Sequence, residues 1–134
     1  MALREIVTVS ILIEAQTGMA IATCKGVFRL NDALEGAKTL WMTPGWFGKS
    51  VGWDFREAGF DLSSPDVRNI AFSVVHDQPT PPPARVAFVT PGDADFGLAR
   101  MFEVFREDPR TEFRVFRDYD EALRWARVVC QDSI

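Results

Sequence analysis

The sequence has 134 residues, a formal net charge of −4, 47% hydrophobic residues and 25% charged residues. These values suit one ordinary globular domain and exclude disordered and fibrous classes. The acidic balance argues against a general nucleic-acid binder, and no apolar run reaches the roughly 18 residues of a membrane span. We therefore expect a single domain over residues 1–134, located in the cytoplasm.

The first two predicted elements are strands of an antiparallel hairpin. Residues 5–13 alternate between apolar and polar side chains, as a half-buried strand does. This segment lacks the basic stretch and small-residue cleavage site of a signal peptide. Residues 19–28 form the second strand after a turn at residues 15–18, and so short a connection predicts antiparallel pairing.

The next elements are a helix, a strand and a second helix. The first helix starts at residue 31 or 32, where Asp32 and Glu35 have capping-box spacing, and ends before Pro44. Residues 51–55 form the third strand and residues 56–63 a loop. The second helix starts at Ser64, which we expect to act as its N-cap, and a proline-rich connector follows it.

Residues 85–90 are predicted to form a central strand of the sheet. Their side chains are apolar on both faces, which is typical of a parallel strand covered by helices. We expect Asp93 to cap the following helix, whose apolar face has i, i+3, i+4, i+7 spacing at Leu98, Met101, Phe102 and Phe105. Gly97 inside this helix costs about 1 kcal/mol relative to alanine, which indicates close backbone approach to the sheet or to another chain.

The last predicted elements are a short strand at Phe113 and Val115 and a helix capped by Asp118. The complete order is β-β-α-β-α-β-α-β-α. Alternation of strands and helices after the first hairpin predicts an α/β protein with a mostly parallel sheet.

Titratable residues do not form a recognisable catalytic set. Cys24 and Cys130 lack metal-like spacing and are expected to be free thiols, and His76 is the only histidine. Asp93 and Asp95 are explained by the N-terminus of a helix. We expect no enzyme, no metal site and no cofactor.

Aromatic residues gather between the first helix and the third strand. Trp46 and Phe47 lie in a loop flanked by glycine and proline, where large side chains are hard to bury. Such residues are candidates for a protein interface, a lid over an apolar ligand or contact with a membrane surface. Folding back over the core is the alternative. Trp53 fits a strand face, as a core residue or a ligand contact.

Three stretches, VGWDFREAGFDLSSPDVRNIA, PGDADFGLARMFE and FRVFRDYDEALRWA, resemble SpoIIAA-like proteins of the STAS/SEC14 type. The resemblance covers nearly the whole chain and is strongest over residues 84–126. It implies one SpoIIAA-like domain, a (βα) superhelix with five strands in the order 1-2-3-4-5. The first strand would be antiparallel and about four helices would cover the two faces.

The resemblance implies a non-enzymatic binding or regulatory module that acts through an unidentified protein partner. An exposed apolar patch would serve this function and would allow a homodimer. The alternative, which SEC14-type relatives imply, is a carrier or sensor of a small apolar or amphipathic ligand. Its pocket would open between sheet and helices, near Trp46, Phe47, Phe96 and Met101.

The resemblance also implies one modification site. In anti-sigma-factor antagonists a serine after the third strand is phosphorylated, and Ser63 of this chain falls on that position, followed by Ser64. Leu62 and Pro65 replace the acid and the glycine of the family's motif. A phosphate or other anion would be stabilised at the helix N-terminus here. The alternative for these serines is simple N-capping.

Overall fold

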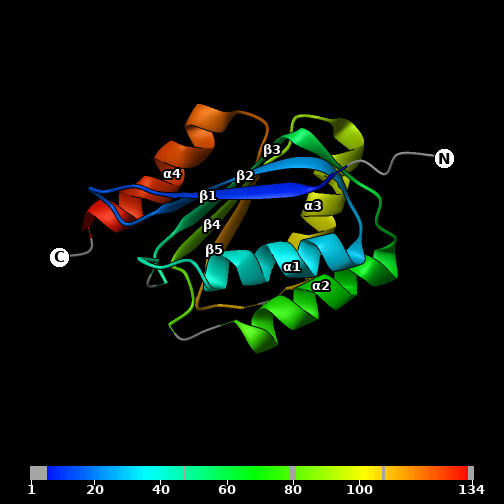
Figure 1. Ribbon diagram of the computed structural model, residues 1–134, viewed down its shortest axis with the longest axis horizontal. Helices are drawn as coiled ribbons and strands as arrows, with labels where there is room; N and C mark the ends of the chain where they lie inside the picture. Colours follow the sequence, from blue (N-terminus) through cyan, green and yellow to red (C-terminus); the bar gives the residue numbers. More distant parts are fainter. Residues whose placement is uncertain (1–5, 47, 79–80, 107, 133–134) are drawn as a thin grey trace.

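A computed structural model describes residues 6–46, 48–78, 81–106 and 108–132. Strands and helices alternate along this part of the chain around one sheet (Figure 1). In chain order they are β1 Thr8–Ile13, β2 Ala20–Phe28, α1 Leu30–Trp41, β3 Val51–Phe60, α2 Ser64–Asp77, β4 Arg85–Val89, α3 Asp93–Phe105, β5 Glu112–Phe116 and α4 Tyr119–Asp132.

The strands of the sheet follow the order β1-β2-β3-β4-β5. β1 runs antiparallel to β2, and each later pair is parallel. Parallel neighbours require a crossover, which α1, α2 and α3 supply in turn. The predicted α/β class, strand order and antiparallel first strand are confirmed.

The two faces of the sheet are covered differently. On one face α4 packs alone, with Ala122, Leu123 and Ala126 against the sheet. A Cβ atom on Gly52 would come within 2.6 Å of Leu123 Cδ2, so this glycine permits the close approach of α4. The other face is covered by α1, α2 and α3, whose apolar stripes meet the aromatic side chains of the central strands.

Three helices start one or two residues away from the expected position. Ser63 rather than Ser64 is the N-cap of α2, and Gly92 rather than Asp93 is the N-cap of α3. Asp93 instead accepts a hydrogen bond from Arg117 at 2.8 Å. α1 begins at Leu30, because Asp32 accepts from the backbone N–H that precedes the helix.

The expected cap of α4 is confirmed, since Asp118 Oδ2 accepts from the backbone N–H of Glu121 at 2.8 Å. Gly97 is exposed, and no atom lies within 4 Å of the position of a Cβ on it. The predicted close approach of Gly97 to the sheet is therefore wrong.

β3 is longer than expected, because residues 56–60 continue the strand instead of forming a loop. Thr23 pairs with Asp54 and Lys25 pairs with Glu57, so β3 carries one extra residue at this point. Such a β-bulge reverses the alternation of side chains beyond it. Phe60 consequently lies on the same face of the sheet as Phe55, although the two are five positions apart, an offset that would place them on opposite faces of a regular strand.

No helix in the described part of the chain has both the length and the apolar character to cross a membrane.

Candidate functional site

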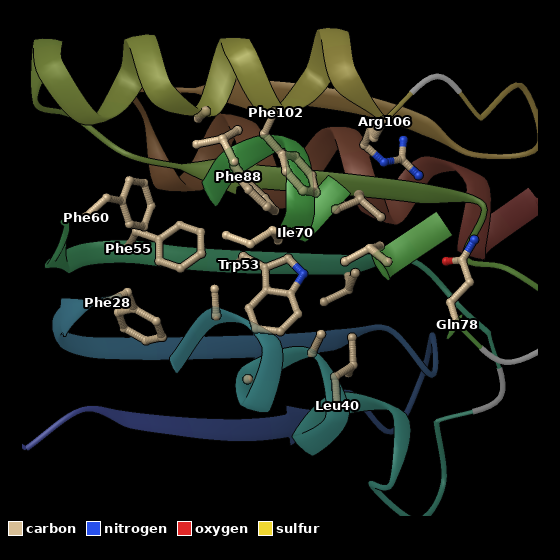
Figure 2. A pocket seen from close by; sticks show the side chains of 18 of the residues that line it. Phe28, Leu40, Trp53, Phe55, Phe60, Ile70, Gln78, Phe88, Phe102 and Arg106 are labelled. Carbon is tan, nitrogen blue, oxygen red and sulfur yellow. The ribbon is translucent and has the colours of Figure 1, made fainter. Parts of the chain in front are cut away.

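A cavity of about 120 Å³ lies between the sheet and helices α1, α2 and α3, and it is partly open to solvent (Figure 2). Apart from two residues, its lining is apolar. The sheet contributes a wall of branched and aromatic side chains from its three central strands: Phe28, Val51, Trp53, Phe55, Phe60, Val86 and Phe88.

The helices contribute the other wall through the apolar stripes that their sequences predict. α1 provides three small residues and two larger ones, Ala33, Gly36, Ala37, Leu40 and Trp41. α2 provides the branched residues Val67, Ile70 and Val74. α3 provides Leu98, Ala99 and Phe102. The small residues of α1 do not fill the volume between this helix and the sheet, so a cavity remains there.

One end of the cavity is aromatic. Phe55 makes edge-to-face contacts with Phe28, Phe60 and Phe88, at ring-centroid distances of 6.0, 4.9 and 5.1 Å. Edge-to-face pairs stabilise a fixed arrangement of rings beyond their buried area. In Figure 2, Phe28, Phe55 and Phe60 lie at the end away from Gln78 and Arg106.

Two polar side chains, Gln78 and Arg106, line the opposite end. Gln78 follows α2 and Arg106 follows α3, so the C-terminal ends of two helices bring them together. Arg106 is only 4% exposed. Its backbone N–H donates to the carbonyl of Phe102 at the end of α3. Its guanidinium forms no hydrogen bond or ion pair within the described residues.

The neighbouring carboxylate of Asp108 is already saturated. Its Oδ1 accepts from the backbone N–H and the Nε of Arg110, at 3.1 and 2.8 Å. Its Oδ2 accepts from Arg110 Nη2 at 2.9 Å and from Gln78 Nε2 at 3.1 Å. Four donors fill the acceptor capacity of a carboxylate. These bonds also hold the pKa of Asp108 below its ordinary value, chiefly through Arg110.

Within the described residues Arg106 therefore forms no ion pair, although the charges of Asp108 and Glu103 favour its protonated form. Burial lowers the pKa of its guanidinium, but arginine remains charged in proteins. The ring of Phe113 lies 5.3 Å from the guanidinium carbon and gives a cation–π contact. Arg106 lines one end of this cavity, and it also lines a shallower hollow between α2 and α3 with Arg68, Phe72 and His76.

The structure brings together only some of the aromatic residues singled out in the sequence. Trp46 and Trp53 line the cavity. Trp46 is 6% exposed, and its Nε1 donates to the carbonyl of Lys49 at 3.0 Å, so it folds back over the core. Phe96 and Met101 do not line the cavity, contrary to expectation. Phe47 lies outside the described residues.

Phe96 and Met101 have other contacts. The guanidinium of Arg117 lies 4.2 Å from the centre of the Phe96 ring. Met101 packs in a cluster of α2 and α3 residues that includes Val67 and Phe102. Both side chains are half-buried.

Ser63 and Ser64 are exposed at the start of α2. Ser63 Oγ accepts from the backbone N–H of Asp66 at 3.2 Å, while the Asp66 carboxylate accepts from the Ser63 N–H at 3.0 Å. These reciprocal bonds form a capping box. Because Asp66 already places a negative charge here, an added phosphate would meet a like charge. Phosphorylation of Ser63 stays a prediction.

The polar end of the cavity was not predicted from the sequence. The available signal is the phase of Arg106, which stands four residues after Phe102 and eight after Leu98, on the apolar stripe of α3. A charge in phase with an apolar stripe is a marker for a buried polar group. Gln78 gives no comparable signal, because it ends α2 beside the proline-rich connector.

Other titratable groups do not form a site in the described part of the chain, where no three His, Cys, Asp or Glu side chains are placed to hold a metal. Cys24 is fully buried in the sheet, and burial raises the pKa of its thiol to about 12. Cys130 lies beyond the last residue whose side chain is described.

Comparison with known proteins identifies the fold. No protein-family model and no curated protein matches the chain. An uncharacterised protein with a SpoIIAA-like fold from Shewanella loihica matches 94% of this chain and 98% of its own, with 20% identity and a TM-score of 0.55. An anti-sigma factor antagonist from Mycobacterium paratuberculosis matches 90% of this chain and 95% of its own, with 15% identity and a TM-score of 0.51. The chain has the SpoIIAA-like fold that its sequence resembles.

Proposed function

We propose that this protein is a non-enzymatic binding module that carries or senses a small apolar or amphipathic molecule in the cavity between the sheet and α1–α3. The observation that supports this proposal is the apolar lining of the cavity, with its two polar groups at one end. Ligand pockets commonly combine a mostly apolar surface with a few polar groups that orient the ligand.

The size of the cavity limits the ligand. An engineered apolar cavity of roughly 150 Å³ stays dry and binds benzene. The present cavity of about 120 Å³ is of the same order. A ligand with an apolar part of about six carbon atoms therefore fits the described walls, whereas a two-chain lipid would require the helices to move apart.

Native mass spectrometry of protein purified gently from its own host tests this proposal. We expect an additional mass of metabolite size that denaturation releases. Calorimetric titration with 1-hexanol provides a defined probe of the same cavity. Recovery of the bare chain from the host, together with no heat of binding for 1-hexanol, would contradict the proposal.

Ala37 and Ala94 offer a matched pair of variants for the titration. Ala37 lines the cavity from α1, whereas Ala94 is exposed in the first turn of α3. Ala37→Phe fills the cavity and should abolish binding of 1-hexanol. Ala94→Phe adds the same group to the surface and should leave binding unchanged.

Interaction with a protein partner is the second candidate function. Phe72 on α2 and Val104 on α3 are both 64% exposed, and the Phe72 ring contacts the His76 ring with centroids 4.1 Å apart and planes tilted by 36°. An exposed aromatic residue beside other apolar groups is a feature of protein interfaces. A likeness to an anti-sigma factor antagonist is compatible with such a function.

Sedimentation velocity tests the simplest form of this candidate, a homodimer. Phe72→Asp should abolish a concentration-dependent dimer. Met42→Asp should leave such a dimer intact, because Met42 is 81% exposed but lies after α1, away from Phe72 and Val104 in the sequence. A monomer at all concentrations would exclude self-association and leave only an unrelated protein as the partner.

A further inference from the structure

The guanidinium of Arg106 is the feature of the cavity that apolar binding alone does not explain. A buried charge without a partner is strongly unfavourable, and folded proteins pair such charges or avoid them. Among the described residues, the two carboxylates whose charges act on Arg106 have other partners. Asp108 is saturated by Arg110 and Gln78, and Glu103 pairs with Arg100 at 3.3 Å.

The charges of Asp108 and Glu103 favour the protonated guanidinium without forming an ion pair with it, and two further weak interactions accompany the Arg106 charge. It stands at the C-terminal end of α3, where the helix dipole favours a cation, and it contacts the face of Phe113. Neither supplies a hydrogen-bond acceptor for the guanidinium donors. An anion that reaches this end of the cavity would supply acceptors in the planar arrangement that arginine binds best.

Building on the function proposed above, we infer that the ligand is a small amphipathic monocarboxylate. Its carboxylate binds Arg106, and its apolar part lies along the cavity toward Phe55. Gln78 sits at the same end, and its bond to Asp108 fixes the direction of its amide.

The balance of charge favours a carboxylate over a phosphate. Arg106 is the one charged side chain among the described residues that line the cavity, so it neutralises one negative charge. A phosphate monoester carries about −1.5 to −2 at pH 7. It would therefore bring excess charge into an apolar space, which a monocarboxylate does not.

Hexanoate and 1-hexanol form a matched pair of probes, since they share a six-carbon chain and differ in charge. Calorimetric titrations at pH 7 should give the wild-type protein at least a tenfold preference for hexanoate, as expected for hydrogen bonds to a charged group. Arg106→Met should bind 1-hexanol as the wild type does and lose this preference. Arg100→Met, on the exposed side of the same helix, should keep it.

The outcomes separate this inference from the function on which it rests. If wild-type protein binds 1-hexanol with no preference for hexanoate, the carboxylate assignment fails and the apolar cavity stands. If it binds neither probe, the carboxylate assignment fails, and the proposed function fails with it when the chain purified from its host also carries no added mass. If Arg106→Met keeps the preference, Arg106 is not the carboxylate partner.

The stability of the ligand-free protein provides an independent readout. Replacement of a buried charge by an apolar side chain of similar length is often neutral or stabilising. Arg106→Met should therefore melt at the same temperature as the wild type or higher, and hexanoate should raise the melting temperature of the wild type alone. A clear fall in melting temperature, or failure to fold, would show a structural role for Arg106 and overturn the inference.

Discussion

Glu14 and Arg127 lie 113 positions apart in the sequence and form a two-pronged ion pair. Arg127 Nη2 and Nε donate to Glu14 Oε2 at 2.8 and 3.1 Å, and Thr17 Oγ1 donates to Glu14 Oε1 at 2.8 Å. Glu14 follows β1 and Arg127 belongs to α4, so the pair joins the first hairpin to the last helix.

The hydrogen bond from Arg127 holds the pKa of Glu14 below its ordinary value in the folded state. A depressed carboxyl pKa stabilises the protein above the unfolded pKa, and this stability disappears as the pH falls through the folded pKa. Glu14→Gln should therefore lower the free energy of unfolding by about 1 kcal/mol at pH 7. In urea titrations the two proteins should converge as the pH falls through the lowered pKa of Glu14 in the folded state.

Glu35→Gln is the control for this prediction, because Glu35 is exposed and pairs with Lys38 at 3.7 Å on the surface of α1. Exposed pairs contribute little to stability. A pH-independent loss in Glu14→Gln would indicate lost packing and not a lost charge.

Gly36 and Gly97 give a second matched pair, since both lie inside helices. A Cβ on Gly36 would meet Val9 and Phe28 at 3.5 and 3.9 Å, which are ordinary contacts, and a Cβ on Gly97 would meet no atom within 4 Å. Alanine at either site should raise the free energy of unfolding by up to about 1 kcal/mol. Because Gly36 lines the cavity, only Gly36→Ala should weaken 1-hexanol binding.

Equal effects of these two substitutions on 1-hexanol binding would place the ligand outside the cavity. Thermal unfolding and calorimetric titration of the same two samples provide both measurements.

Cys24 should be chemically inert in the folded protein. Its thiol is buried and its pKa is raised to about 12, so the reactive thiolate is scarce at pH 8. In a Cys130→Ser background, a thiol reagent should label Cys24 only after urea unfolds the chain. Rapid labelling under native conditions would mean that the centre of the sheet opens readily.

The bulge in β3 depends on Asp54. Its carboxylate accepts from the backbone N–H, the Nε and the Nη2 of Arg56, at 3.0, 2.9 and 2.9 Å. Asp54→Ala leaves the bulge amide without its acceptor and should lower the free energy of unfolding by about 2 kcal/mol. Asp61→Ala, which removes an exposed pair with Arg29, should change it by less than about 0.5 kcal/mol in the same urea titration.

The helix faces were predictable because they depend on a local period, whereas the strand order was implied by the resemblance to SpoIIAA-like proteins. Apolar residues such as Leu40, Ile70 and Phe102 recur at helical spacing, and in the structure they all face the sheet. The continuous apolar run at residues 86–89 similarly predicted a strand covered on both faces.

The bulge and the cavity were not predictable in this way. One extra residue near Arg56 shifts the alternation of side chains in β3. The apolar–polar pattern of the sequence is therefore interrupted there, although the strand continues to Phe60. The burial of Trp46 depends on a carbonyl that the loop brings to its indole N–H. The cavity depends on how α1, α2 and α3 pack together on one face of the sheet. The sequence pattern of a single helix does not determine this packing.

The placement of the tryptophans gives the molecule a built-in optical reporter. Three of the four, Trp41, Trp46 and Trp53, line the cavity, whereas Trp125 packs on Phe116 at the opposite face of the sheet. In a Trp125→Phe protein, all indole emission would come from the cavity side. Its wavelength would then report, without any attached dye, whether water or an organic molecule occupies that space.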